Sequence, residues 1–133
     1  YKKVLKKTPK IAVLGINPHN YSGYKKKSDE NNIVLPAIKF LKKKKINIVG
    51  PISPDTSFMI YKKYKIDTIV GMYHDQVLTP FKSIFEFDAI NITLGLPFIR
   101  VSPDHGVGSN IVGKKIANPN SLIESIKFFN NLK

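Results

Sequence analysis

The sequence predicts an α/β fold in which the strands form a parallel or mixed sheet. Short apolar segments typical of buried strands alternate along the chain with amphipathic segments that begin with helix-start residues. The length of 133 residues is that of one ordinary domain, and 42% hydrophobic with 23% charged residues is the composition of a folded protein. These observations favour a domain with a hydrophobic core over a disordered chain.

The first two strands and the helix between them are predicted near the start of the chain. Residues 11–17 (IAVLGIN) form an apolar run typical of a buried strand, and residues 47–49 form a shorter one. Polar residues at 28–30 supply a helix start for an amphipathic pattern over residues 30–45. Because proline disrupts a helix interior, we expect the regular helix to begin only at Pro36. The side chains expected to face inward are Ile33, Val34, Ala37, Ile38 and Leu41.

Two further helices are predicted on either side of a third strand. Ser53 suits the N-cap and Pro54 the first turn of a helix that ends near Lys63. Residues 67–72 have the apolar pattern of a strand, and residues 75–84 predict the helix that follows it.

The last part of the chain predicts one more strand and a final helix. Residues 87–93 (FDAINIT) form the strand. Ser121 and Glu124 have the spacing of a capping box, which predicts a helix that begins there and extends to about Asn131.

The formal net charge of +13 raises the question of a nucleic-acid partner. Every basic residue except Arg100 is a lysine, and the lysines gather at an expected helix end (Lys42–Lys45) and in an expected loop (Lys25–Lys27). Nucleic-acid-binding proteins rely on arginine for bidentate contacts to bases and phosphates. Since no zinc-finger, RNP-like or helix-turn-helix pattern accompanies the charge, we do not expect nucleic acid to be the partner.

The residue types and segments that the chain lacks exclude several classes of protein. The chain has no cysteine, which excludes disulfides and thiolate-bound metal and fits a cytoplasmic location. No apolar run approaches the roughly 20 residues that span a bilayer. The basic start YKKVLKKTPK also lacks the apolar region of a signal peptide. Because the chain opens on Tyr1 and not on Met, either its start is processed or it belongs to something longer.

Two of the three histidines follow predicted strands in the same way. His19 closes IAVLGINPH and His74 closes IDTIVGMYH. Ligands bind at the carboxyl ends of strands in open α/β sheets, and histidine is both the commonest metal ligand and the usual acid or base at neutral pH. The alternative is that both are ordinary surface or core histidines. Asp75, beside His74, could be a third ligand or a carboxylate that orients the imidazole.

Arg100, Lys82 and His105 are the other candidate binding residues. The guanidinium of Arg100 can hold a carboxylate or phosphate with two hydrogen bonds, although a structural ion pair would also explain it. Lys82 lies about two helical turns after His74 and could point at the same cleft. His105 lies in PDHGVGSN, a glycine-punctuated loop that could approach an anionic or nucleotide ligand or form an ordinary turn.

Five motifs occur in order from about residue 10 to the end of the chain: GINPH, GPISPDTSF, MYHDQ, NITLGLPFIR and DHG. Together they resemble the 4-hydroxythreonine-4-phosphate dehydrogenase family of pyridoxal phosphate (vitamin B6) biosynthesis. The resemblance implies a three-layer sandwich of the isocitrate/isopropylmalate dehydrogenase-like type, here incomplete. It also implies a homodimeric enzyme that uses NAD, or alternatively NADP, to oxidise and decarboxylate the phosphorylated amino acid 4-phosphohydroxy-L-threonine.

The resemblance implies a divalent metal, Zn, Mg or Co, as the second cofactor. Two of the family's three metal-binding histidines match His19 and His74, and the third belongs to an upstream motif that no residue here matches. Such a metal is a Lewis acid that polarises the substrate hydroxyl and stabilises the charge that develops on decarboxylation.

The resemblance also implies binding residues for substrate and cofactor. The substrate-binding positions of the family match Lys82, Asn91 and Arg100. The segment HGVGSNIVGKKIANP is similar to the cofactor loop of isocitrate and isopropylmalate dehydrogenases. This second similarity implies that His105 and Asn118 lie near the adenosine of NAD.

The chains of this family are much longer than this one. By the family's topology, residues 1–89 are part of the metal-binding α/β domain, and residues 90–133 are a C-terminal segment that returns to the other, mostly absent domain. We therefore expect that this chain alone neither completes the metal site nor reaches the family's rate. A separately encoded N-terminal half is a partner that would complete it.

The sequence departs from the family pattern at three places. Residues 20–22 replace AGE after NPH, residues 77–79 replace GLP after MYHDQ, and Val107 replaces a threonine after DHG. Three interpretations follow. The chain is the C-terminal part of a dehydrogenase, whether a fragment or one half of a split enzyme. Alternatively, it is a non-catalytic remnant that keeps the fold as a binding subunit, or a small basic nucleic-acid-binding protein.

Overall fold

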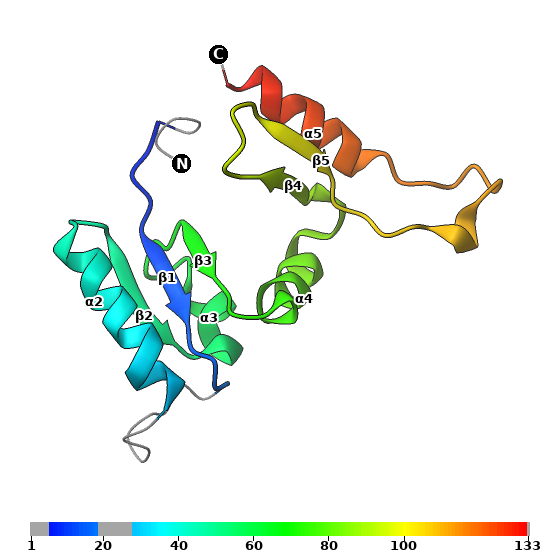
Figure 1. The fold of residues 1–133 in the computed structure, drawn as a ribbon. Helices are drawn as coiled ribbons and strands as arrows, with labels where there is room; N and C mark the ends of the chain where they lie inside the picture. Colours follow the sequence, from blue (N-terminus) through cyan, green and yellow to red (C-terminus); the bar gives the residue numbers. More distant parts are fainter. Residues whose placement is uncertain (1–5, 19–27, 133) are drawn as a thin grey trace. The chain divides into compact units, whose positions relative to one another are not determined.

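The computed structural model describes residues 6–18 and 28–132 (Figure 1). The chain divides into two compact units, Tyr1–Phe81 and Lys82–Lys133. Helices and strands alternate along it, which confirms the predicted α/β class. The three-layer sandwich type and the assignment of residues 1–89 and 90–133 to two domains of a complete enzyme stay predictions. Within the described ranges, no helix has the length and apolar character needed to cross a membrane.

The first unit contains a three-stranded parallel sheet. Its strands are β1 (Ile11–Leu14), β2 (Ile48–Ile52) and β3 (Thr68–Val70), in the order β2-β1-β3 (Figure 1). The central strand β1 is the best covered, since Ala12 and Leu14 are fully buried. All three strands run the same way, so their carboxyl ends lie at one edge of the sheet, where α/β proteins bind ligands.

The helix between β1 and β2 begins where Pro36 predicts. A π-helical turn, η1 (Glu30–Val34), precedes the regular helix α2 (Leu35–Lys43), and Pro36 lies in the first turn of α2. Proline is tolerated in a first turn because the amides there have no acceptor within the helix. The expected lysine-rich helix end is confirmed: Lys42 and Lys43 lie in the last turn, where positive charge is favourable to the helix dipole.

The core of the first unit lies where α2 meets the sheet. Two residues expected to face inward do not, since Ile33 is 61% exposed and Ala37 is also exposed. Only the narrow helical stripe through Val34, Ile38 and Leu41 turns toward the strands. The core cluster comprises Val13, Val34, Ile38 and Ile48, with Ile11, Ile16 and Leu41 packed against it.

The helices α3 (Pro54–Ile60) and α4 (His74–Phe85) confirm two further predictions. Pro54 lies in the first turn of α3 as expected, but Ser53 does not cap that helix through its side chain. Its hydroxyl instead lies 2.6 Å from the carbonyl oxygen of Pro18 and 2.5 Å from Oδ1 of Asp55. Ser53 therefore ties the start of α3 to the segment that follows β1.

The second unit contains an antiparallel ribbon with one long helix packed against it (Figure 1). The ribbon pairs β4 (Ile90–Thr93) with β5 (Arg100–Pro103), and the helix is α5 (Asn120–Asn130). The sequence did not predict β5, because its proline-flanked segment becomes a strand only by pairing with β4. The predicted strand over 87–93 begins late, since Glu86–Asp88 forms the 3-10 turn η2.

The predicted capping box at the start of α5 is wrong. The helix begins at Asn120, and its N-cap residue is Pro119, which makes no side-chain cap hydrogen bond. The Ser121 hydroxyl is fully buried; it accepts a hydrogen bond from the Asp104 amide (2.8 Å) and donates one to the Ala89 carbonyl (2.5 Å). Glu124 pairs with the ammonium of Lys127 (2.7 Å) and not with the helix start. The Ser121 hydroxyl therefore links α5 to the segments beside β4 and β5 and does not cap its own helix.

The two sides of α5 differ in an unusual way. Its buried residues are the small polar Ser121 and Ser125. Four of its five large apolar residues are at least 41% exposed: Leu122, Ile123, Ile126 and Phe129. The fifth, Phe128, is half-buried. The helix thus buries its serines and leaves an apolar side, formed by Leu122, Ile123, Ile126 and Phe129, exposed.

Candidate functional site

The MYHDQ motif is fastened to the carboxyl edge of the parallel sheet by Gln76. Its side-chain oxygen accepts a hydrogen bond from the Met72 amide (2.8 Å), just after β3. Its side-chain nitrogen donates to the carbonyl of Gly15 (3.0 Å), just after β1. One amide side chain therefore joins two strand ends and fixes the position from which α4 begins. The sequence offered no separate signal for this role.

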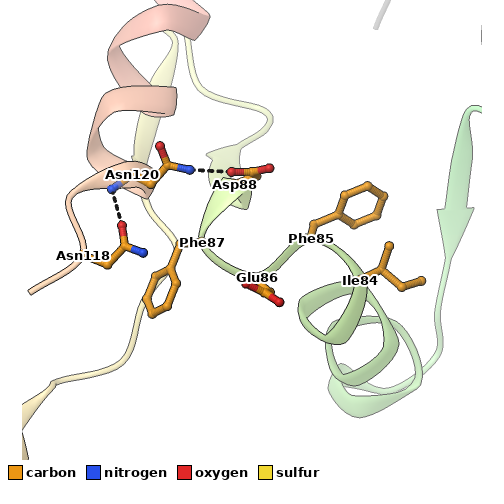
Figure 2. A pocket seen from close by; sticks show the side chains of 7 residues that line it. All are labelled: Ile84, Phe85, Glu86, Phe87, Asp88, Asn118 and Asn120. Atoms are coloured by element: carbon orange, nitrogen blue, oxygen red, sulfur yellow. Dashed lines mark hydrogen bonds between the residues drawn. The ribbon is translucent and has the colours of Figure 1, made fainter.

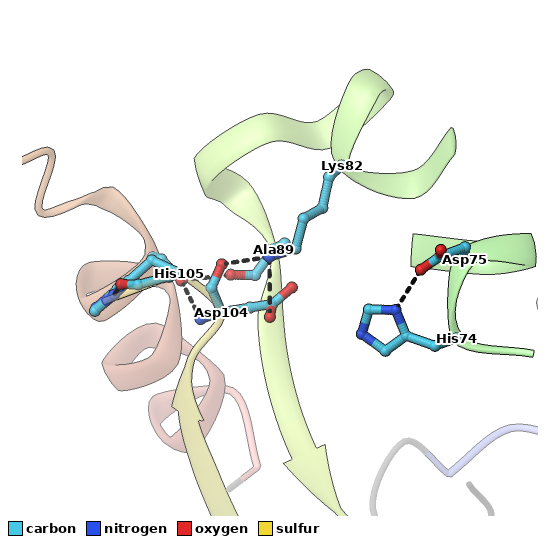
Figure 3. A network of polar contacts seen from close by, with 8 residues as sticks. His74, Asp75, Lys82, Ala89, Asp104 and His105 are labelled. Atoms are coloured by element: carbon cyan, nitrogen blue, oxygen red, sulfur yellow. Dashed lines mark hydrogen bonds and ion pairs between the residues drawn. The ribbon is translucent and has the colours of Figure 1, made fainter. Parts of the chain in front are cut away.

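His74 opens α4, and its neighbour Asp75 orients its ring. Nδ1 of His74 lies 2.7 Å from Oδ1 of Asp75, as Figure 3 shows. Both side chains are largely exposed, at 78% and 86%. With Nδ1 held by a carboxylate, Nε2 is the nitrogen that remains for a ligand, which is the usual arrangement of a metal-binding histidine. Of the two roles considered for Asp75, the geometry matches that of the orienting carboxylate.

His19, the other predicted metal ligand, lies outside the described residues, as do the departures at residues 20–22. In the parts of the chain that the structure describes, no three histidine, aspartate or glutamate side chains gather as a metal site. The donor chemistry of His74 with Asp75 fits one ligand of a divalent metal but does not complete a ligand set. The described residues alone therefore do not form the predicted centre.

Glu30 is a buried acid that positions the segment leading to His19. Its carboxylate Oε1 accepts a hydrogen bond from the Asn17 amide (2.7 Å), and the residue is only 5% exposed. This hydrogen bond is the main reason that the pKa of Glu30 lies below its ordinary value, against the opposing effect of burial. The sequence had suggested Glu30 only as a helix-start residue.

Lys82, the first residue of the second unit, is held in place by Asp104. Its ammonium lies 3.3 Å from both the carboxylate Oδ1 and the carbonyl oxygen of Asp104. Asp104 is in turn held through its amide by Ser121, which also bonds Ala89. A chain of polar contacts thus joins the start of β4, the end of β5 and α5 to the predicted substrate lysine.

Asn91 and Arg100 lie on one face of the β4–β5 ribbon. In the ladder Asn91 is opposite Ser102 and Thr93 is opposite Arg100, so these four side chains share a face by the two-residue period of strands. Arg100 donates a hydrogen bond from Nη1 to the Thr93 hydroxyl (2.9 Å). In the described part of the chain it has no acidic partner, so the alternative of a structural ion pair gains no support.

His105 and Asn118 line the same cavity, of about 650 Å³. Nδ1 of His105 lies 2.9 Å from the carbonyl oxygen of Gly106, and the side-chain oxygen of Asn118 accepts from the Asn120 amide (2.9 Å). No lysine, arginine, aspartate or glutamate lines this cavity. Imidazole and amide groups with apolar walls suit a heterocycle such as the adenosine end of a dinucleotide.

Two smaller cavities adjoin the same turn. One, of about 230 Å³, is lined by the acids Glu86 and Asp88, and Figure 2 shows Asp88 bonded to the amide side chain of Asn120. The other, of about 390 Å³, is lined by Lys82, Asp104 and His105. The side chain of Phe87, which sequence reasoning did not select, lines both of them as well as the larger cavity.

Comparison with known proteins decides the family. The model of the family described as "Pyridoxal phosphate biosynthetic protein PdxA" matches residues 1–129. This chain belongs to the PdxA family. The resemblance seen in the five motifs is thereby confirmed, while the role of each PdxA site residue remains a prediction.

The PdxA relatives are longer than this chain. The 4-hydroxythreonine-4-phosphate dehydrogenase of a Sulfurihydrogenibium species is 53% identical over 119 residues, which are 90% of this chain and 36% of the relative. That of Desulforapulum autotrophicum is 46% identical over 90% of this chain and 35% of the relative. The crystal structure of the Klebsiella pneumoniae enzyme has a TM-score of 0.79 at 37% identity, over 98% of this chain and 40% of that one. The chain spans about a third of the length of these curated PdxA relatives.

Proposed function

We propose that this chain provides the C-terminal part of an NAD- and divalent-metal-dependent dehydrogenase of pyridoxal phosphate biosynthesis. The reaction is the oxidation and decarboxylation of 4-phosphohydroxy-L-threonine, in the cytoplasm and in a homodimeric enzyme. The observation that carries the proposal is the PdxA family match together with relatives named 4-hydroxythreonine-4-phosphate dehydrogenase. Nucleic acid is not a partner in this proposal.

The cationic and amide side chains of the second unit bind and orient the substrate. Arg100 offers a planar fork to a carboxylate or phosphate, and its bond to the Thr93 hydroxyl directs that fork. Lys82 adds a second positive charge at a position fixed by Asp104. Asn91, on the same ribbon face as Arg100, supplies neutral hydrogen bonds. Holding the substrate in one orientation is their contribution to the rate.

His74, with His19, provides the metal ligands of this chain. Asp75 holds Nδ1 of His74, so that Nε2 is the coordinating atom. A divalent cation bound there supplies Lewis-acid polarisation of the substrate hydroxyl. The third ligand comes from outside this chain, in the part of the PdxA length that it does not span.

His105 and Asn118 bind the cofactor, which is NAD or alternatively NADP. Both line the cavity of about 650 Å³, which has no acid, lysine or arginine in its lining and whose size and lining suit an adenosine. The nicotinamide at the other end of the cofactor supplies the hydride acceptor. The protein residues fix where the adenosine lies and do not take part in the hydride step.

The test is an NADH-formation assay with 4-phosphohydroxy-L-threonine, NAD and a divalent metal. The chain is assayed alone and mixed with a polypeptide that supplies the remainder of a PdxA relative. We expect rapid NADH formation only in the mixture, and loss of that rate when Arg100 is changed to lysine. Failure of a mixture that forms a stable complex would contradict the proposal.

A second candidate function is a binding subunit that keeps the PdxA fold without catalysis. Val107 favours it, because this residue replaces a hydroxyl of the family pattern and lies 97% exposed at the cofactor cavity. In that case a stable complex with the remaining polypeptide would form but produce no NADH. Restoring the hydroxyl with Val107→Thr would then leave the complex inactive, whereas an impaired enzyme would gain rate.

A further inference from the structure

Phe87 is the single side chain common to the three cavities of the second unit described above. It lies in the middle of η2, the one-turn helix between α4 and β4. Its ring is 44% exposed, so much of its surface is open to a ligand. An aromatic ring with an open face is a stacking platform for a flat heterocycle.

The turn that carries Phe87 is anchored on its C-terminal side. The carboxylate of Asp88 accepts a hydrogen bond from the side chain of Asn120, as Figure 2 shows. The next residue, Ala89, is 2% exposed, and its carbonyl oxygen accepts the Ser121 hydroxyl. Both bonds tie the turn to the start of α5. A ring on an anchored turn loses little conformational freedom when a ligand stacks on it.

Charge is distributed unevenly around the Phe87 ring. The cavity of about 390 Å³ is lined by Lys82, Glu86 and Asp104. The cavity of about 230 Å³ is lined by Glu86 and Asp88. The larger cavity has no ionisable acid or lysine and is lined by His105, Asn118 and aliphatic side chains such as Ile111 and Ile116. A ligand part that enters the larger cavity against Phe87 meets no acid or lysine there, which suits a flat ring that is polar only at its edges.

We infer that Phe87 is the stacking residue for the adenine ring of the dinucleotide. The inference rests on the proposed function and adds to it a cofactor contact that the motifs did not indicate. Phe87 lines the larger cavity together with aliphatic residues, and His105 and Asn118 in the same lining would supply the polar contacts to the edge of the ring. The residue binds the cofactor and takes no part in proton or hydride transfer.

The test is titration of the full chain with AMP and, separately, with nicotinamide mononucleotide, followed by calorimetry and proton NMR. Replacing the ring in Phe87→Ala and Phe87→Leu should weaken AMP binding roughly tenfold, since base stacking on an aromatic side chain is of that size. Phe87→Tyr keeps the ring and should bind as the unchanged chain does. The adenine H2 and H8 resonances should shift upfield on binding and lose that shift in Phe87→Leu.

Phe129→Ala is the matched control, because Phe129 has nearly the same exposure (45% against 44%) and lines none of these cavities. Phe87→Leu keeps the apolar volume, so that a loss of binding with an unchanged circular dichroism spectrum supports stacking. Equal AMP affinity in all Phe87 variants overturns the inference and leaves the proposed dehydrogenase standing. Absence of AMP binding by the unchanged chain overturns the inference together with the proposed cofactor site, and NADH formation in the mixed assay then shows whether the enzyme function survives.

Discussion

At His74 the adjacent carboxylate decides which ring nitrogen can act. Asp75 occupies the Nδ1 side at 2.7 Å, and a ligand is left with Nε2. At Arg100 a neighbouring hydroxyl directs the guanidinium without neutralising it, since Thr93 accepts a hydrogen bond but has no charge. In both cases a short-range contact orients a side chain to which the proposed function assigns a binding role.

Replacing His74 by alanine should weaken divalent metal binding, because it removes a coordinating nitrogen. Asp75→Asn should weaken it less, on the order of 10-fold to 100-fold, since outer-shell partners of metal ligands have effects of this size. Calorimetric titration with Zn²⁺ or Co²⁺ measures both, alongside His19→Ala. His105→Ala, the third histidine of the chain, is the control and should bind metal normally. Unchanged metal affinity in both the His19 and His74 variants would mean that no site is retained.

Glu30 should make stability depend on pH. Its pKa is lowered in the folded chain from an ordinary value of 4.5, so its charged form stabilises the fold above that pH. This stabilisation is lost as the pH falls through the lower, folded-state pKa. Glu30→Gln keeps an acceptor for the Asn17 amide but loses the charge, and should reduce the free energy of unfolding by on the order of 1 kcal/mol at neutral pH.

Urea unfolding of both forms across the acid range checks this expectation. The difference between them should shrink once the pH is well below 4.5. A difference that stays constant with pH would show that the charge of Glu30 contributes nothing. Asp29→Asn, one residue earlier and more exposed, is the matched control.

At the scale of elements, the sequence predicts best where the local residue pattern alone decides the structure. The pattern around Pro36 locates the start of α2, and the apolar runs locate β1 and β3. Local sequence patterns do not predict the structure where a contact between residues distant in sequence determines it. The strand β5 exists through its pairing with β4, and the Ser121 hydroxyl bonds Ala89 and Asp104 instead of capping its own helix.

Ser121→Ala should therefore lower the free energy of unfolding by more than the loss of a cap at an exposed helix end would. It leaves the Asp104 amide and the Ala89 carbonyl without their buried partner, at about 1–3 kcal/mol of unfolding free energy. Ser125→Ala is the matched control, since Ser125 is also buried on α5 but bonds only the carbonyl of Ser121 within the helix. Thermal unfolding compares the two. An equal, small effect would show that the links to Asp104 and Ala89 are dispensable.

At the scale of the whole molecule, the motifs select most of the residues of the proposed site, and the fold shows which of them lie together. His105 and Asn118 were selected by similarity to a cofactor loop, and they do line one cavity. Asn91 and Arg100 came from a motif, and the ribbon register brings them to one face. Phe87 carried no signal, because a phenylalanine between two acids has no distinctive pattern, and only the turn that holds it brings it to three cavities.

The apolar side of α5 should limit solubility. Exposed apolar patches promote association, and charges placed on them oppose it. The double variant Leu122→Glu and Ile126→Glu should raise the solubility limit and change the free energy of unfolding by less than about 0.5 kcal/mol, because both residues are exposed. Asn130→Glu, which adds charge outside that side, is the control. Sedimentation at several protein concentrations measures the difference, and equal association of all forms would contradict the expectation.

The same helix gives salt an unusual influence on the chain. A net charge of +13 keeps copies apart by electrostatic repulsion, while the uncovered side of α5 draws them together. At physiological ionic strength the screening length falls to about 8 Å, so the repulsion weakens while the apolar attraction does not. We therefore expect the chain to stay dispersed in dilute buffer and to associate as salt is added, so that the salt content of the buffer controls its colloidal state.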